Sequence, residues 1–498
     1  MVLNTDNSPD AAAIAADALS RINAIKPTTT SIEKPSYIYT VENQKTGEVS
    51  NRLDYVKYSN FLRSHFSVIY FNKTLYIYDS FSHVYRQQTN EIETHIRDTI
   101  VSFGIYGKLK AHIDEIKTHL VSMGSYTEYP FNCDAYCIPV ENGIIKLDYE
   151  NEAITLLPHG PSHFFTYKLV ATYDPNAKNC NAIPLLKRLV EPEYIKTLIQ
   201  IPAQALLQMQ TGHAYKKAYL LQGEPHAGKT SYLKLLYMLF GNDFTTSISL
   251  QQLCTDRFVG GNLEGKLLNI YDDLEDVALE VIDQFKTLTG DCRHGIERKY
   301  SEKYTGKVTA VHIFTCNYPP EYPAKVRRDT AFWARWEYLK FPFAYPVNPN
   351  FYTEWYTKET ISSFLNLILS AMIVIRKRGL LANSDIQDVM ENWSINSDPM
   401  YDFLGSLFVS ANGKDTHYFS KSKLYNVYVR WCNDNNIPDH RRKLTLTAFS
   451  IALQGHGFTP SRKRENRNNY EVYSSITMML PQGSPLDLDY KTECTKIS

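Results

Sequence analysis

The chain has 498 residues, of which 43% are hydrophobic and 21% are charged, a balance typical of folded proteins that excludes collagen-like, wholly disordered and heavily charged classes. This length predicts about three domains. Lys plus Arg and Asp plus Glu both number 53, so any binding to nucleic acid has to come from local basic patches. Eight irregularly spaced Cys residues and the lack of an apolar leader predict a reducing, cytoplasmic setting.

Three regions are expected in the first part of the chain. Residues 1–35 are poor in apolar side chains and predict a disordered tail. Residues 36–130 mix aromatic strand-like runs with helical spacing, which predicts an α+β domain. Residues 131–210 are expected to be mostly helical after two short strand-like segments. They contain Cys133 and Cys137, but no second Cys or His pair follows at zinc-finger spacing, so we expect no structural zinc site there.

The second part of the chain changes pattern. Residues 211–345 alternate short apolar β runs with helical segments, which is typical of an α/β fold with a largely parallel sheet. Residues 346–399 are expected to form a helical extension and a linker. The longest apolar stretch, 360–375, has 16 residues with polar interruptions, short of the roughly 20 that cross a membrane, so a buried helix is expected. Residues 400–480 predict three helices and a β-hairpin, followed by a tail at 481–498.

A phosphate-binding loop is predicted where an apolar strand meets a helix, in the segment GEPHAGKTS. The pattern G-x-x-x-x-G-K-[ST] gathers loop amides and a helix N-terminus around a polyphosphate. We expect Lys229 to bind the β and γ phosphates of ATP, and Thr230 to bind Mg²⁺. A glycine-rich turn before a surface helix is the alternative. The predicted nucleotide-binding residues are Gly223, Glu224, Pro225, His226, Ala227, Gly228, Lys229, Thr230 and Ser231.

Polar side chains follow the next two strands. Asp272 and Asp273 come after the run KLLNIY, where one carboxylate can hold Mg²⁺, for which we choose Asp272, and the other can polarise an attacking water. Asn317 ends the following strand, where an amide can orient that water. A helix cap and a turn residue are the ordinary alternatives. Arg335, which lies among aromatic residues, is a candidate arginine finger for a neighbouring subunit's nucleotide, and this role requires an oligomer.

Five segments, GEPHAGKTS, NIYDDLED, FKTLTGD, IFTCNYPP and DTAFWARWEYLKFPF, occur in the order found in superfamily 3 helicases. The chain most resembles the primase-helicases of phages, plasmids and archaeal viruses, including the poxvirus-type primase-helicase, and its C-terminal part resembles their winged-helix segment. The resemblance implies an AAA+ type P-loop NTPase core with Walker B acids at Asp272 and Asp273, a sensor at Asn317 and a trans-acting finger at Arg335. It also implies a hexameric ring that moves 3′ to 5′ on single-stranded DNA.

Two basic segments predict contacts with DNA. The segment RHGIERKYSEKYTGK is expected to form a hairpin in the pore of a ring, where cations neutralise phosphates and aromatic rings stack on bases. A solvated charged hairpin is the alternative. The run SRKREN falls in the predicted winged-helix-like domain, where a solubilising loop explains the same residues. The predicted DNA-binding residues are Lys299, Lys303, Tyr304, Lys307, Arg462, Lys463 and Arg464.

Together these expectations predict an ATP-hydrolysing replicative DNA helicase of a virus or plasmid. It is expected to work as a homo-hexamer on single-stranded and forked DNA inside a host cell, away from membranes. We expect no primer synthesis and a separate primase or polymerase as partner, because Asp148, Glu150, Ser162 and His163 lack the spacing of a primase metal site. An AAA+ packaging or remodelling ATPase and a non-enzymatic origin-binding initiator are the alternatives.

Overall fold

The computed structural model divides the chain into two compact units, which are described separately. The first contains residues 34–77 and Gln87–Thr127, and the second contains Tyr78–Arg86 and the chain from Glu128 onward. Both predicted tails lie outside the residues that the structure describes, except for residues 34 and 35. Lys299, one of the predicted DNA-binding residues, also lies outside them. Those described are 34–177, 181–275, 279, 281–297, 303–322, 324–382, 384–405, 407–409, 418–437, 439–456, 458, 460–465, 468–474 and 476–478.

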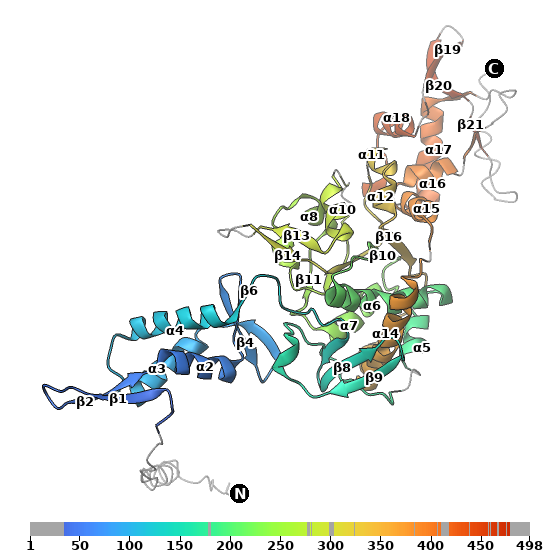
Figure 1. Ribbon diagram of the computed structural model, residues 1–498. Coiled ribbons are helices and arrows are strands. Elements are labelled where there is room, and N and C mark those ends of the chain that lie inside the picture. Colours follow the sequence, from blue (N-terminus) through green and yellow to red (C-terminus); the bar gives the residue numbers. More distant parts are fainter. Residues whose placement is uncertain are drawn as a thin grey trace, which may run out of the picture. The chain divides into compact units, whose positions relative to one another are not determined.

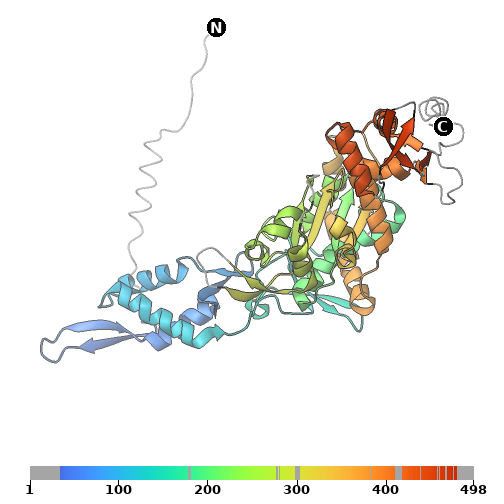
Figure 2. The same cartoon turned by 90° about the horizontal axis from the view of Figure 1, so that it is seen from above.

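Helices and short strands alternate in the first unit. Its helix α2 begins after Asp54, whose side chain accepts a hydrogen bond from the backbone of Lys57 at 3.0 Å. In both views the β1–β2 hairpin extends beyond the helices of this unit (Figure 1, Figure 2). A small core around Tyr58 and Ile96 joins the three helices. The elements up to residue 127 are β1 (Ile38–Glu42), β2 (Val49–Leu53), α2 (Tyr55–Phe66), β3 (Ile69–Phe71), β4 (Thr74–Asp79), β5 (Val84–Gln87), α3 (Glu91–Ser102), α4 (Leu109–Gly124) and β6 (Ser125–Tyr126). The end of β4 and most of β5 fall in Tyr78–Arg86, which belongs to the second unit.

Residues 131–210 begin with a three-stranded antiparallel sheet, in which β8 and β9 correspond to the two strand-like segments that we expected and β7 is an additional strand. Short apolar runs joined by tight turns are too brief for helices but suit strands. Two helices follow, and the longer, α6, is buried along nearly its whole length although Pro202 lies inside it. The elements are β7 (Cys137–Val140), β8 (Gly143–Asp148), β9 (Ala153–Leu157), η1 (Pro161–His163), α5 (Ala182–Lys187), η2 (Pro192–Tyr194) and α6 (Ile195–Thr211).

A five-stranded parallel sheet, as predicted for an α/β fold, forms the centre of the second unit. Its strand order is β11-β12-β15-β10-β16, so β15 pairs with both β10 and β12. Every residue of β15 is buried, as expected for a parallel strand covered on both faces. This order brings the carboxyl ends of three strands side by side. The strands are β10 (Ala218–Gln222), β11 (Thr245–Thr246), β12 (Leu268–Tyr271), β15 (Val311–Cys316) and β16 (Trp336–Lys340).

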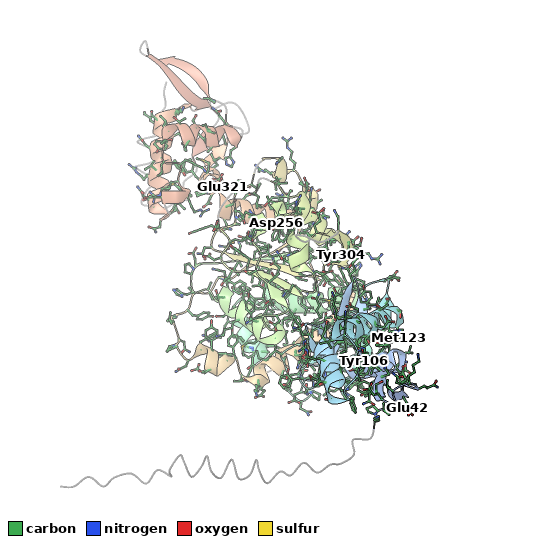
Figure 3. All side chains as sticks on the ribbon, turned by 90° about the vertical axis from the view of Figure 1, so that its left-hand side faces the viewer. Glu42, Tyr106, Met123, Asp256, Tyr304 and Glu321 are labelled. Carbon is green, nitrogen blue, oxygen red and sulfur yellow. The ribbon has the colours of Figure 1, made fainter. Side chains whose placement is uncertain are left out.

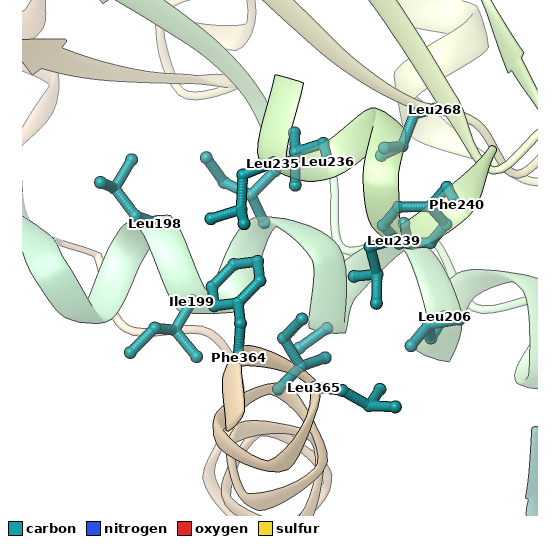
Figure 4. Close-up of a cluster of buried hydrophobic side chains, with 14 of the residues drawn as sticks. Leu198, Ile199, Leu206, Leu235, Leu236, Leu239, Phe240, Leu268, Phe364 and Leu365 are labelled. Atoms are coloured by element: carbon teal, nitrogen blue, oxygen red, sulfur yellow. The ribbon is translucent and has the colours of Figure 1, made fainter. Parts of the chain in front are cut away.

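Helices and one hairpin surround this sheet. Figure 4 shows that Leu198 of α6, Leu235 of α7 and Phe364 of α14 belong to one buried cluster. The helix α14 is long and apolar enough to cross a membrane, but most of it is buried against this cluster, as predicted. The elements are α7 (Lys229–Phe240), α8 (Leu250–Thr255), α9 (Val259–Leu263), α10 (Asp283–Gly290), β13 (Arg293–Ile296), β14 (Tyr304–Lys307), α11 (Ala324–Arg327), α12 (Thr330–Trp333), α13 (Phe351–Trp355) and α14 (Lys358–Arg378).

The C-terminal part contains the predicted succession of three helices and a hairpin. The helices α16, α17 and α18 share a core around Phe403, Tyr428 and Phe449. The hairpin strands β19 and β20 form a three-stranded sheet with β18. The elements are α15 (Ile386–Ser397), α16 (Pro399–Gly405), β17 (Leu407–Val409), β18 (Tyr418–Ser420), α17 (Lys421–Asp434), η3 (Asp439–Arg441), α18 (Leu446–Gly455), β19 (Ser461–Glu465), β20 (Asn468–Ser474) and β21 (Ile476–Met478).

Candidate active site

The predicted phosphate loop connects β10 to α7, and its two glycines are needed for different reasons. A Cβ atom on Gly223 would lie 2.4 Å from the carbonyl oxygen of Phe341, so only glycine fits beside this backbone. Gly228 has a φ of +89° and a Cβ there would lie 2.6 Å from Leu189 Cδ2. Gly228 precedes the first residue of α7, so the loop leads directly into a helix N-terminus. This is the backbone arrangement that binds phosphates.

Lys229 and Asn317, predicted from separate motifs, are in direct contact. The Lys229 ammonium donates to Asn317 Oδ1 at 2.7 Å and to the carbonyl oxygens of Gly223 and Glu224. Gln222 Nε2 donates to the Asn317 carbonyl at 3.0 Å, which fixes the backbone of the predicted sensor. Burial lowers the pKa of Lys229 from its ordinary value, while the nearby carboxylates oppose this shift. The structure therefore places a cation and a polar amide at one point beside the loop.

The predicted Walker B acids lie close to Lys229 and influence its pKa. Asp272 Oδ2 accepts a hydrogen bond from Thr230 Oγ1 at 3.0 Å, and Oδ1 accepts one from Thr315 Oγ1 at 2.5 Å. The backbone N–H of Asp273 donates to the same Thr315 hydroxyl at 2.8 Å, with Asp273 at a φ of +63°. Thr315 thus orients both acids, a role that we did not predict. Its signal in the sequence is a hydroxyl within a largely apolar buried strand, two residues before Asn317.

Thr230 and Asp272 suit a magnesium ion. Their oxygens lie 3.0 Å apart on the exposed carboxyl edge of the sheet. Mg²⁺ prefers oxygen donors and is held in nucleotide sites by one or two protein oxygens together with phosphates and water. The residues present therefore fit the ion that the sequence predicts, with Asp273 beside them at the same strand end.

A pocket of about 300 Å³ opens from the loop. Residues from His226 to Ser231 form one wall, and Tyr345 to Asn348 form part of another. The guanidinium of Arg188, which also lines the pocket, lies 4.7 Å from the ring centroid of Tyr345. Arg188 and Tyr345 were not predicted, because neither belongs to a motif and both are far from the loop in sequence. A flat cation and an aromatic ring are suited to contact with a planar base.

Arg335 lies at the opposite edge of the sheet. It directly precedes β16, and its carbonyl accepts a hydrogen bond from Ala218 at the amino end of β10. The five-residue strand β10 separates this edge from the phosphate loop by about 16 Å. The Arg335 side chain donates to Thr289 Oγ1 at 2.8 Å and to the carbonyl of Lys286 at 3.1 Å. Arg335 is thus far from its own loop, and the action in trans that we predicted stays a prediction.

The predicted pore hairpin exists as β13 and β14, but its basic residues differ in environment. The Lys303 ammonium is exposed and pairs with Glu297 at 3.1 Å. The hydroxyl of Tyr304, labelled in Figure 3, donates to a Glu264 carboxylate. The Lys307 ammonium instead donates to the Met209 carbonyl at the base of the hairpin, and burial lowers its pKa. Lys307 is therefore held at the base of the hairpin, and its contact with DNA stays a prediction.

The basic residues of the C-terminal part form two groups, one that contacts the rest of the second unit and one on the hairpin. The first group contains Arg441 and Lys443. Arg441 donates to the carbonyl of Ser397 at 3.0 Å, and its guanidinium lies 3.8 Å from the ring centroid of Tyr318, the residue after the predicted sensor. Lys443 pairs with Glu321 at 3.3 Å. These cations hold the C-terminal domain against the loop that follows β15.

The wing residues Arg462, Lys463 and Arg464 lie on β19, which pairs with β20 in an antiparallel hairpin. Their backbone positions agree with the predicted wing. Their side chains lie outside the part of the chain whose side chains the structure describes. Contact of these three residues with DNA therefore stays a prediction.

Two stretches of the chain match known families. Residues 221–335 match a family of unknown function, DUF5906, and this stretch contains the loop, both acids, Asn317 and Arg335. Residues 395–481 match a family described as Poxvirus D5 protein-like, and this stretch contains the three C-terminal helices and the hairpin. The poxvirus likeness thus falls on the C-terminal part, which we expected to resemble the winged-helix segment of the primase-helicases. A comparison with curated proteins finds no match.

Solved structures with a related arrangement come from the NrS-1 C-terminal region. Its A form apo structure is 13% identical with a TM-score of 0.42, and the match covers 85% of this chain and 98% of that one. A second apo structure of the region, residues 305–718, is 12% identical with a TM-score of 0.37, covering 84% and 97% of the two chains.

Proposed function

We propose that this protein is an ATP-dependent replicative DNA helicase of superfamily 3, related to the viral and plasmid primase-helicases and built on an AAA+ type P-loop core. One observation carries the proposal. Lys229, Thr230, Asp272 and Asn317 come from three separate motifs, yet they form two hydrogen-bonded pairs at the carboxyl edge of a parallel sheet, Lys229 with Asn317 and the next residue, Thr230, with Asp272. The match of the C-terminal part to Poxvirus D5 protein-like sequences supports the proposed relationship.

Each residue of this group has a role in ATP hydrolysis. Lys229 exchanges its carbonyl partners for the β and γ phosphate oxygens, and the loop amides and the N-terminus of α7 bind the same phosphates. Magnesium, held by Thr230 and Asp272, neutralises charge on the phosphates when bound. Asp273 accepts a proton from the attacking water, and the Asn317 amide orients that water. The short hydrogen bonds to Thr315 hold both acids in position for these roles.

The proposed helicase is a homo-hexamer in which Arg335 contacts the nucleotide of the adjacent subunit. The β13–β14 hairpin, with Lys303 at its exposed side, contacts the translocating single strand. Movement is 3′ to 5′, and a separate primase or polymerase supplies primers. The wing residues on β19 contact the duplex or a partner subunit.

The test measures ATP turnover and strand displacement on a forked duplex with the full chain. Lys229→Ala is expected to lower turnover at least about 100-fold, because loss of a group that stabilises transition-state charge costs this much. Lys196→Ala is the matched control, since Lys196 is exposed on α6 and distant from the loop in sequence. It should keep both activities.

The same assays separate the alternatives. An AAA+ packaging or remodelling ATPase would hydrolyse ATP with no displacement of the fork, and a non-enzymatic initiator would bind DNA with no turnover. A template-dependent primer made by the purified chain would contradict the absence of primase activity. Wild-type protein that neither binds ATP nor unwinds DNA would refute the proposal.

A further inference from the structure

Three donor side chains of different kinds meet beside the strand β7. Asp134 and Cys137 lie in and just after the turn that leads into β7, and His163 ends the short helix η1. His163 Nδ1 lies 2.7 Å from Asp134 Oδ2, and the Cys137 sulfur joins them so that the three ligand atoms lie within 4.8 Å of one another. Within the described residues, no other group of three or more His, Cys, Asp or Glu side chains is this close.

The donor set and spacing suit a transition-metal cation. Thiolate, imidazole and carboxylate are the three ligand types that proteins offer to zinc, with bonds of about 2.0 to 2.3 Å. Neighbouring ligand atoms on a tetrahedron of this size are separated by about 3.3 to 3.8 Å. The three ligand atoms lie close enough to converge on one ion, and the 2.7 Å contact between His163 and Asp134 has to lengthen when the ion enters. A hard oxygen-binding ion such as Mg²⁺ would not select the cysteine sulfur.

The burial of the three residues differs in a way that favours a bound ion. Cys137 is 2% exposed, while the side chains of Asp134 and His163 are each 25% exposed. The inner ligand is thus shielded from solvent, and the outer two leave one side open to water. Asp134 Oδ1 accepts a hydrogen bond from the backbone of Tyr136 at 2.9 Å, which fixes the carboxylate and leaves Oδ2 facing His163.

We propose that Asp134, Cys137 and His163 bind one Zn²⁺ ion, with water at the fourth position. Binding requires loss of the Cys137 thiol proton to solvent and a neutral His163 imidazole. The ion would tie the turn before β7 to η1. The next residues of the chain contact the segment Tyr78–Arg86, because Phe165 O accepts a hydrogen bond from Tyr85 N at 2.6 Å. The site is independent of the proposed helicase activity and of the Mg²⁺ residues.

The experiment titrates the full-length protein, stripped with a chelator, with Zn²⁺ and separately with Co²⁺. We expect the protein to bind one equivalent of metal ion tightly. Bound Co²⁺ should also give a thiolate-to-metal charge-transfer band in the near ultraviolet. Asp134→Asn keeps the shape of the side chain and should weaken Zn²⁺ binding by more than the roughly 10- to 100-fold that loss of an outer partner costs. Cys137→Ser should abolish the charge-transfer band.

Two controls address other thiols and folding. Cys254→Ser changes a buried cysteine in α8, and Cys133→Ser changes the exposed neighbour of Asp134. Both should keep the tight equivalent and the band. Because Cys137 is buried, Asp134→Asn serves as the second variant if Cys137→Ser does not fold. Wild type that binds no Zn²⁺ tightly, or equal binding by Asp134→Asn, would overturn the proposal.

Discussion

Among single residues, Gly228 is the one whose lack of a side chain the phosphate loop needs most. Its φ of +89° disfavours any other residue, and its missing Cβ leaves room for Leu189. Gly265 has a similar φ of +75° but no atom within 4 Å of its Cβ position. A comparison of substitutions at Gly228 and Gly265 therefore separates the cost of backbone strain from the cost of steric overlap.

We expect Gly228→Ala to destabilise the protein by about 2 to 4 kcal/mol and to abolish ATP binding, because strain and overlap add. Gly265→Ala should cost only about 1 kcal/mol through strain and should leave ATP binding unchanged. Denaturant unfolding and binding of a fluorescent ATP analogue measure the two effects. Equal losses in both variants would show that contact with Leu189 is unimportant.

His312 makes the stability of the protein depend on pH. It is buried in β15 near Phe285 and Phe314, and neither ring nitrogen has a hydrogen-bond partner among the described residues. Burial lowers the pKa of His312 to about 3, below the unfolded value of about 6.5. The unfolded chain therefore binds the proton first, and the free energy of unfolding falls as pH drops from about 6.5 toward 3.

Replacing this ring by phenylalanine removes the titration and keeps an aromatic side chain in the cluster. Between pH 7 and 5.5, wild type should lose about 1 kcal/mol more unfolding free energy than His312→Phe. Urea unfolding at the two pH values gives the comparison. Identical losses would mean that His312 is protonated in the folded protein.

At the scale of elements, two lysines of the β13–β14 hairpin have different environments. One is exposed, and the other is held by the core. Lys303 stands at the exposed side of the hairpin, whereas Lys307 donates to the carbonyl of Met209 in α6. The first lysine is free to exchange Glu297 for a phosphate. The second joins the base of the hairpin to the core of its unit.

Alanine substitutions should separate these roles. Lys303→Ala is expected to weaken binding of single-stranded DNA and to reduce the salt slope by about 0.7, with unfolding free energy within about 0.5 kcal/mol of wild type. Lys307→Ala should instead lower the unfolding free energy by about 1 to 3 kcal/mol, because the Met209 carbonyl loses a charged donor. Salt-dependent DNA titrations and urea unfolding measure both. A large stability loss in Lys303→Ala would refute this division.

For the whole molecule, the main question is whether one active site needs two chains. Arg335 and the phosphate loop lie at opposite edges of one sheet, so a ring with head-to-tail contacts is the arrangement that lets them meet. Arg335→Ala subunits keep an intact loop, and Lys229→Ala subunits keep an intact finger.

We therefore expect two inactive variants to complement each other. In an equal mixture, roughly a quarter of the interfaces combine an intact loop with an intact finger, so a similar share of wild-type ATP turnover should return. Turnover is measured after the mixed chains are allowed to exchange, with each variant alone as the baseline. If the mixture stays inactive while mixed oligomers form, Arg335 does not act in trans.

Much of the nucleotide site was predictable because its parts are local. The loop from Gly223 to Thr230 is one continuous motif, and polar residues at the ends of parallel strands are expected to meet at one edge. Contacts that depend on distant segments were not predictable. The contact of Thr315 with both acids is established only by the fold, although its hydroxyl in a buried strand is a weak signal in the sequence, and Arg188 is recognised only when the pocket forms. In the antiparallel sheet within residues 131–210, the strands β8 and β9 correspond to the two strand-like segments that we expected, whereas the short strand β7 was not predicted.

By itself, the amino-acid sequence determined the phosphate loop, the acids, the parallel α/β core and the order of the C-terminal elements, because each depends on neighbours within a few residues. Only the tertiary structure decided which charged groups are available to a ligand. Lys307 is bound by a carbonyl 98 residues away, and His163 meets Asp134 across 29 residues. Burial and partner choice arise from packing between segments, so no local pattern encodes them.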